Sequence, residues 1–262
     1  MTEIRPIRRN EAEPFLELLC TVFGLDYNRA YSIFFDEPYF DLARKWAVFQ
    51  GTEVVSILTV TPLEFGWGKA IGIAGVATKE KYRREGFATR LIQKVLTTAD
   101  HAGEGAVLLF AQRPDLYAPL GFEMIDRVVR APLPPSMLSQ PTPLEESRIL
   151  DVQEVREVYD RWAAANPDRL VRDDRRWQYF LWNYRVAEPV GGGYAVVEPN
   201  LMREALYHRS TESLPFPPGS EWLGTTFMAD QLGLVFSSAV VELFLMGRNF
   251  PRVPQFFMTD QF

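Results

Sequence analysis

Three apolar runs of strand length follow one another between residues 45 and 78, and they restrict the possible folds more than any other part of the sequence. The runs are Lys45–Gln50, Val54–Phe65 and Ala70–Thr78. Glycine-containing turns separate them, at residues 50–51 and at residues 66–69. Short turns of this kind join neighbouring antiparallel strands. The sequence therefore predicts a sheet built from two consecutive hairpins.

Helical and strand-like segments flank the hairpins in a definite order. Before the hairpins we expect a strand at Ile4–Arg9 and helices at Asn10–Phe23 and Tyr27–Phe35. After them we expect, in order, a helix at Gly86–Ala102, a strand at Ala106–Ala111, a helical turn at Pro114–Leu120 and a strand at Phe122–Val129. The helices are predicted because their apolar residues recur on one face. This β-α-α-β-β-β-α-β-α-β order predicts an α/β chain, as an α+β mixed sheet with helices on its faces, and not a doubly wound nucleotide-binding fold.

A proline-rich segment divides the chain. Residues 131–143 contain five prolines together with Ser, Gln and Thr, which predicts a boundary between domains at residues 1–133 and 144–262. The second part is expected to contain helices at Asp151–Ala165 and Asp174–Tyr184, and strands at Tyr194–Glu198, Glu204–His208 and Ala239–Met246. Because it repeats the helix–helix–strand–strand opening of the first part, we expect a degenerate second copy of the same fold. The triple glycine at residues 191–193 precedes a strand, so it predicts a hairpin turn.

Composition excludes several classes of protein. A formal net charge of -6 argues against general binding of nucleic acids, which needs a basic surface. One cysteine, Cys20, and two distant histidines make a disulfide framework or a metal site improbable. No signal-peptide pattern and no run of 18 apolar residues is present, so we expect a cytoplasmic protein without a membrane partner. Cys20 falls among leucines of the first helix, which favours a buried thiol over a nucleophile.

The segment from Val76 to Thr89 contains the residues that most clearly indicate a binding site. A strand ends at Thr78, a polar turn follows, and a helix begins near Gly86. The first N–H groups of a helix have no partner within the helix, so they form a binding place for an anion. Gly86 and Ala88 keep side-chain bulk away from those amides. The sequence therefore predicts an anion site with added positive charge from arginines at 83 and 84.

The pattern Arg83-x-x-Gly86-x-Ala88 resembles the signature of the GNAT superfamily of N-acetyltransferases. A second match lies downstream, where Tyr117 precedes Gly121-Phe122. The resemblance covers residues 3 to 130 and implies a GNAT fold for the first part, with acetyl-CoA as co-substrate, and, with the repeated opening of the second part, two tandem GNAT-like halves of which the second is degenerate. It implies cofactor binding by Val76, Thr78, Arg83, Arg84, Glu85, Gly86, Phe87, Ala88 and Thr89. The expected activity is direct transfer of an acetyl group to a primary amine in a ternary complex.

Two catalytic groups follow from this resemblance. A phenol has a pKa near ~10, close to that of a thiol, so Tyr117 is the expected general acid for the departing thiolate; packing is the alternative. The aromatic end of the sequence, residues 256–262, is similar to that of the enhanced intracellular survival family of tandem GNAT proteins. On that analogy the α-carboxylate of Phe262 is the base, although this chain has no room for that family's third domain. A structural role for this tail is the alternative, with Glu64, Asp36 or Glu37 acting through water.

The sequence says less about the site that would bind the amine acceptor. Residues 26–40 combine aromatic and acidic side chains, which suits a cationic amine, but their helical spacing also suits a core. We expect a small-molecule or peptide amine as acceptor. An inert acyl-CoA-binding or sensing protein and a protein N-terminal or lysine acetyltransferase remain alternatives. The second part is expected either to shape the acceptor pocket or to mediate homo-oligomer formation.

Overall fold

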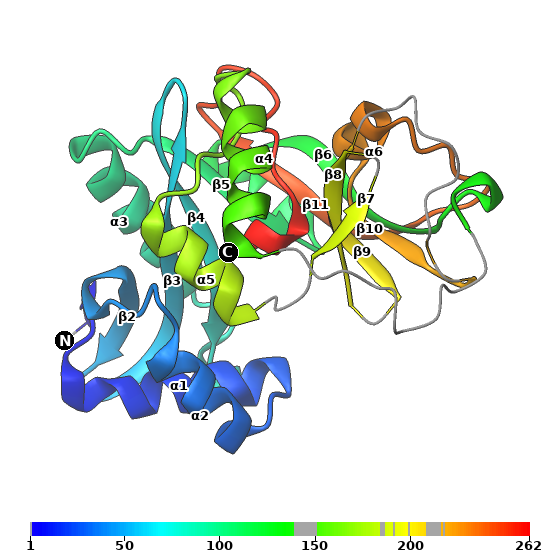
Figure 1. Ribbon diagram of the computed structural model, residues 1–262. Helices are drawn as coiled ribbons and strands as arrows, with labels where there is room; N and C mark the ends of the chain where they lie inside the picture. Colours follow the sequence, from blue (N-terminus) through cyan, green and yellow to red (C-terminus); the bar gives the residue numbers. More distant parts are fainter. Residues whose placement is uncertain are drawn as a thin grey trace.

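The first half of the chain contains the predicted series of elements (Figure 1). The computed structural model describes residues 2–138, 151–183, 187–190, 192–198, 200–207, 216 and 218–262. In the first half, the elements are β1 (Thr2–Pro6), α1 (Ala12–Phe23), α2 (Tyr27–Asp36), β2 (Lys45–Gln50), β3 (Glu53–Phe65), β4 (Gly68–Thr78), α3 (Phe87–His101), β5 (Ala106–Ala111) and β6 (Glu123–Pro132). The helical turn after β5 is two 3-10 turns, Pro114–Leu116 and Ala118–Leu120. The predicted order is therefore confirmed, with small shifts at element ends.

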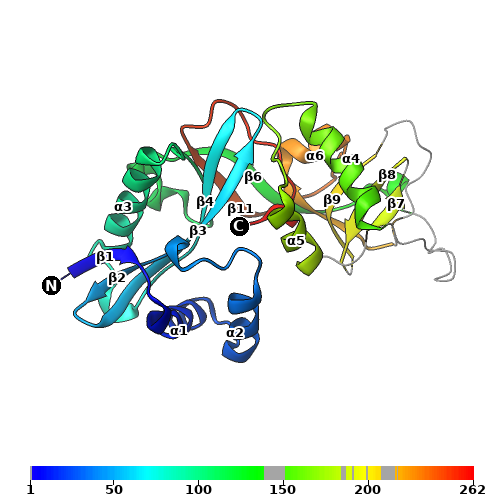
Figure 2. The ribbon, with the colours of Figure 1, turned by 60° about the vertical axis from the view of Figure 1, so that its left-hand side comes forward.

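Alternating apolar residues place helices on both faces of this sheet. In β2, Trp46 and Val48 belong to the core beneath α3, whereas Ala47 and Phe49 belong to the core beneath α1. Such alternation is the period of a strand that is buried on both sides. Figure 2 shows α1 and α3 on opposite faces of the sheet. In the described part of the chain, no helix has both the length and the apolarity that a membrane crossing requires.

The second half repeats the helix–helix–strand opening and contains three elements that the sequence did not predict. Its elements are α4 (Val152–Ala164), α5 (Asp174–Asn183), β7 (Glu188–Val190), β8 (Gly193–Val197), β9 (Leu201–Leu206), β10 (Glu221–Thr225), α6 (Thr226–Leu232) and β11 (Val240–Arg248). β7, β10 and α6 were missed because the strands are only three and five residues long and the helix only seven. At those lengths a periodic pattern has too few positions to be recognised. Tyr184, Gly191 and His208 lie outside the described residues.

One sheet runs through both halves. Among the described residues its order is β1-β2-β3-β4-β5-β11-β6-β10-β9-β8-β7. The parallel pair β4–β5 is followed by β11, and the parallel pair β9–β10 is followed by β6. Each half therefore contributes its last strand to the other half, as expected of two tandem copies of one fold. The boundary between residues 133 and 144 stays a prediction.

The sheet opens between β4 and β5. The two strands pair from Ala70 and Ala106 only as far as Ile73 and Leu109, while β4 continues to Thr78. A bulge lies just beyond the last pair, because Gly75 has φ of 60° and the register of β4 against β3 shifts there. Bulges bend a strand and commonly lie beside functional sites. This one directs the end of β4 away from β5.

Candidate active site

The N-terminus of α3 presents a row of backbone amides. Arg84 and Gly86 both have the left-handed conformation, with φ of 68° and 75°. In the part of the chain that the structure describes, the N–H groups of residues 84–89 meet no hydrogen-bond acceptor. Amides at the positive end of a helix dipole bind anions. We call residues 83–89 the cradle.

The side chains of the cradle divide between solvent and core. Arg83, Arg84, Glu85, Gly86 and Thr89 are exposed, and Ala88 is half-buried. Phe87 is only 3% exposed and packs in the core beneath α3. Its N–H is thus the part of Phe87 available to a ligand, and its ring fixes the helix to the sheet. Arg83 Nε donates to the carbonyl oxygen of Thr78 over 3.3 Å, which ties the cradle to the end of β4.

A carboxylate that the sequence analysis did not identify holds the turn before the cradle. Glu53 accepts hydrogen bonds from Lys79 Nζ, Lys81 Nζ and the Tyr82 hydroxyl at 2.9, 3.1 and 2.8 Å. The Lys79 ammonium, followed by the other two donors, lowers the pKa of Glu53 to about 2. Glu53 therefore stays ionised at neutral pH and fixes the path of the chain from β4 to the cradle.

The opening between β4 and β5 forms a groove of about 410 Å³. Val76 lines it at the bulge, where no residue of β3 or β5 pairs with it. Tyr117 lines the groove from the turn after β5, with its ring edge-on to Phe122 at 6.2 Å. Burial raises the pKa of the Tyr117 hydroxyl. Tyr117 is half-buried, and its hydroxyl is a protonated donor on the lining of the groove.

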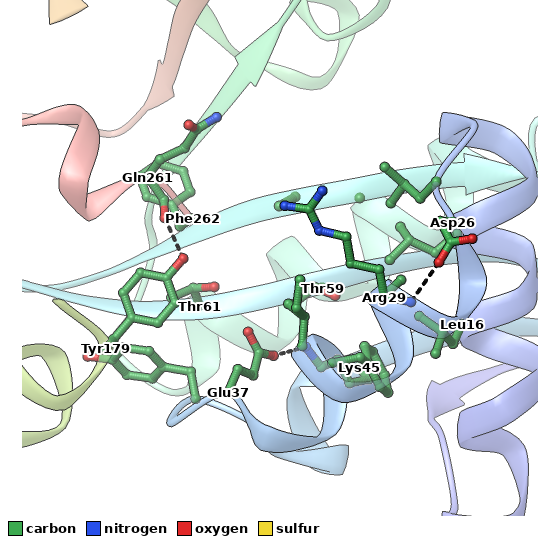
Figure 3. Close-up of a pocket in the computed structure, with 18 of the residues that line it drawn as sticks. Leu16, Asp26, Arg29, Glu37, Lys45, Thr59, Thr61, Tyr179, Gln261 and Phe262 are labelled. Atoms are coloured by element: carbon green, nitrogen blue, oxygen red, sulfur yellow. Dashed lines mark hydrogen bonds and ion pairs between the residues drawn. The ribbon is translucent and has the colours of Figure 1, made fainter. Parts of the chain in front are cut away.

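A second hollow, the inner cavity, has a volume of about 650 Å³ and lies on the α1–α2 side of β4 (Figure 3). Leucines of α1, the inner face of α2, threonines of β3 and residues of α5 form its walls. The inner cavity and the β4–β5 groove share four lining residues, Ala74, Gly75, Gln261 and Phe262. The two hollows therefore meet at the bulge of β4 and the last two residues of the sequence.

Phe262 lies where the hollows meet. A Cβ atom on Gly72 would be only 2.1 Å from Phe262 Cδ2, so the ring rests directly on the backbone of β4. The ring also stacks on Phe110 with centroids 5.1 Å apart. Tyr179 of α5 donates its hydroxyl to the Gln261 carbonyl oxygen at 3.5 Å, which Figure 3 shows beside Phe262. A glycine at position 72 is thus required for this placement of the tail.

Buried charges anchor the tail from behind. The Arg172 guanidinium donates to both carboxylate oxygens of Asp260, at 2.9 and 2.8 Å, and to both oxygens of Glu204, at 3.1 and 2.6 Å. Thr259 donates to Glu204 as well. The side chains of Arg172, Glu204 and Asp260 are 0–1% exposed. No sequence pattern predicts this cluster, because its members are far apart in the chain and resemble ordinary surface residues.

The three alternative carboxylates occupy different places. Glu37 lines the inner cavity but pairs with Lys45 Nζ at 2.7 Å. Asp36 is exposed and does not line either hollow. Glu64 lines a separate cavity of about 260 Å³. Of the three, only Glu37 reaches the inner cavity, and it is already occupied by an ammonium group.

Cys20 and the triple-glycine turn were the subjects of two further predictions from the sequence. Cys20 is 6% exposed within the core beneath α1, and burial raises the pKa of its thiol. It is therefore a packing residue. Val190 pairs with Gly193 across a hairpin turn that includes Gly192 at φ 77°, which confirms a hairpin and leaves no helix there to bind an anion.

The fold and the two adjoining hollows are suited to acyl transfer. A sheet that splits beside a helix N-terminus can hold an extended acyl carrier, with its anionic end at the cradle and its acyl end in the β4–β5 groove. Residues 3–125 match the family model of the acetyltransferase (GNAT) domain. This match supports an N-acetyltransferase that takes its acetyl group from acetyl-CoA.

Solved structures with the same fold cover both halves of the chain. They include a GCN5-related N-acetyltransferase from Kribbella flavida, with a TM-score of 0.72 and 16% identity over 94% of this chain and 70% of that one. Eis1 from Mycobacterium abscessus has a TM-score of 0.62 and 14% identity over 94% of this chain and 73% of Eis1. A GCN5-related N-acetyltransferase from Anabaena variabilis has a TM-score of 0.62 and 16% identity, with 95% and 72% covered. No curated protein sequence matches the chain.

Proposed function

We propose that this protein transfers the acetyl group of acetyl-CoA to the primary amine of a small molecule, by direct attack within a ternary complex. One observation carries the proposal: the β4–β5 groove and the inner cavity meet at Ala74, Gly75, Gln261 and Phe262. A donor in one hollow and an acceptor in the other would therefore come into contact without a covalent intermediate on the protein. Holding two reactants in this way supplies much of the rate enhancement of a bimolecular reaction.

The donor is assigned to the cradle and the groove. The N–H groups of residues 84–89 would hold the pyrophosphate, and the exposed guanidinium groups of Arg83 and Arg84 would add positive charge beside it. From there the pantetheine arm would run along the end of β4, past Thr78, to Val76. The thioester would then lie at the bulge.

The proposed reaction forms a C–N bond and breaks a C–S bond. The neutral amine nitrogen attacks the thioester carbonyl carbon, and the Val76 N–H stabilises the negative charge on the carbonyl oxygen. The C–S bond then breaks, and the Tyr117 hydroxyl gives its proton to the thiolate. Burial raises the pKa of Tyr117, so the phenol holds its proton at neutral pH, which is the form that can donate.

The proton lost by the amine is assigned to the α-carboxylate of Phe262. Phe262 lines both hollows, so a group on it is within reach of an amine that faces the thioester. Glu37 is disfavoured because Lys45 already pairs with it at 2.7 Å. The phenol of Tyr39, which also lines the inner cavity, is a poor base because desolvation raises its pKa to about 12.

A small acceptor is favoured over a protein side chain. α5 and the tail close the inner cavity from the second half through Arg176, Tyr179 and Phe262. A peptide substrate would need an extended open groove at this point. The second half is thus assigned the role of shaping the acceptor site.

Binding of the donor is tested by thermal unfolding with acetyl-CoA. A ligand at ~100 times its Kd stabilises the native state by ~2.7 kcal/mol, and Gly86→Glu should abolish this shift because a carboxylate would occupy the place of the pyrophosphate. Gly103→Glu is the matched control, since Gly103 has φ of 73°, lies after the opposite end of α3 and, like Gly86, has no atom near its Cβ position. If the Gly86→Glu variant keeps the wild-type shift, the assignment of the cradle is wrong.

A further inference from the structure

We infer that the acceptor is a primary monoamine with an apolar body, such as an alkyl- or arylalkylamine, and not a polycation; this inference rests on the proposed function. The inner cavity combines three features that favour such a molecule. Its walls are mostly apolar, its two carboxylate side chains already have partners within the protein, and apolar side chains form its outer rim.

The apolar walls come from both halves. α1 and the following loop contribute Leu16, Leu19 and Leu25, and α2 contributes Ala30, Ile33 and Phe34; the rings of Tyr39, Tyr179 and Phe262 complete this surface. Burial raises the pKa of Tyr39 to about 12 and also raises that of Tyr179. Both shifts reflect poor hydration of this wall. An alkyl chain gains free energy in such a place, whereas an unpaired ammonium loses its hydration.

The two carboxylates of the cavity have partners within the protein. Asp26 accepts a hydrogen bond from the Arg29 backbone N–H at 2.8 Å and caps α2. Glu37 pairs with the Lys45 ammonium, whose side chain is only 4% exposed. In Figure 3 these groups face their partners at the α2 side of the cavity.

Cations of the protein also line the cavity. They are Arg29, Lys45 and Arg176. Arg176 donates to the carbonyl oxygens of Pro62 and Asp260 and lies 3.6 Å from the Asp260 carboxylate. The α-carboxylate of Phe262 is assigned to the attacking amine, so a second ammonium on the acceptor would find no further carboxylate to pair with among the described lining residues. It would also approach positive side chains, and like charges in a poorly hydrated site repel.

The rim continues the apolar surface outward. Leu25 and Ile33, which line the cavity, are 49% and 43% exposed, and Phe23 beside the groove is 51% exposed. Exposed apolar groups gathered at a cavity mouth mark a place where an apolar ligand is bound. Here they would contact the part of the acceptor farthest from its amine.

The experiment compares hexylamine with 1,6-diaminohexane, which have the same chain length and differ in one terminal ammonium. Calorimetry in the presence of CoA gives the Kd of each amine, and steady-state assays with acetyl-CoA give each kcat/KM. We expect hexylamine to be favoured at least tenfold in both measurements. Ile33→Glu should reduce that preference at least tenfold, because it places a carboxylate in the apolar wall. Leu181→Glu is the matched control, since Leu181 is a helical residue outside the cavity with 44% exposure, and it should keep the wild-type ratio.

Each outcome of this experiment either supports or overturns the inference of an apolar monoamine acceptor. A diamine that binds as tightly as hexylamine, or an absence of binding by both amines, overturns the inference. An Ile33→Glu variant with the wild-type ratio also overturns it, because the preference would then arise elsewhere. If hexylamine binds with the expected preference but is not acetylated, the cavity assignment stands and the proposed function fails.

Discussion

Replacing Gly72 by alanine tests the placement of the tail at the site. The new Cβ would lie 2.1 Å from Phe262 Cδ2, whereas carbon atoms in contact are ~3.5–4.0 Å apart. The ring must therefore retreat by ~1.5 Å, because the Gly72 backbone is held in β4 between its partners in β3 and β5. Overpacking of this kind typically costs ~1–3 kcal/mol of stability, or roughly 2–12 °C in Tm for a chain of this size.

The effect on catalysis should exceed the effect on stability. A misplacement of ~1 Å near the reacting atoms can lower the rate ~10²-fold, so Gly72→Ala should reduce kcat by about 10- to 100-fold at 25 °C. The thermal shift with acetyl-CoA should survive, because the cradle lies on a different part of the first half.

A matched variant separates crowding from position. Gly224→Ala in β10 would also place a Cβ 2.1 Å from a buried aromatic ring, that of Trp222, and Gly224 lines neither hollow. It should lower Tm to a similar extent and leave kcat within about twofold of wild type. Equal kcat values for the two variants would show that the position of Phe262 does not matter for the reaction.

Three further changes test other parts of the account. Tyr117→Phe should lower kcat by ~10²–10⁴ without changing the Kd of acetyl-CoA; because burial raises the pKa of Tyr117, the wild-type kcat should show no loss from ionisation of this group below pH ~10. Arg172→Met leaves buried Glu204 without its cation and Asp260 with only Arg176 at 3.6 Å, so urea denaturation should show a loss of ~3–5 kcal/mol; a loss below ~1 kcal/mol would contradict the anchoring role of the cluster. Three polar residues added after Phe262 should reduce kcat sharply while the acetyl-CoA shift persists, and an extended protein with wild-type turnover would exclude the α-carboxylate as base.

Local patterns predicted the first half of the fold well. The hairpins between residues 45 and 78 and the helix at 87–101 follow from apolar periodicity and turn residues, which act over a few positions. The cradle was predictable for the same reason, since Gly86 and the amides after it are neighbours in sequence. Tyr117 was found through its spacing to Gly121-Phe122, and the structure places it in the β4–β5 groove.

Contacts between distant parts of the chain could not be predicted. β11 lies between β5 and β6, although more than 100 residues separate it from either strand, and no local pattern specifies such a neighbour. The cluster of Arg172, Glu204 and Asp260 likewise depends on tertiary burial that the sequence does not reveal. α5 forms part of the wall of the inner cavity only through the packing of the second half against the first, which no local pattern specifies.

The most direct measurement of the central claim is the stoichiometry of one reaction. The protein is incubated with acetyl-CoA and hexylamine, and mass spectrometry quantifies free CoA, N-acetylhexylamine and acetylated protein over time. Direct transfer in a ternary complex predicts one N-acetylhexylamine for each CoA released, with no acetyl group on the protein at any time. Release of CoA without N-acetylhexylamine, or an acetyl-protein that forms before the product, would contradict the account.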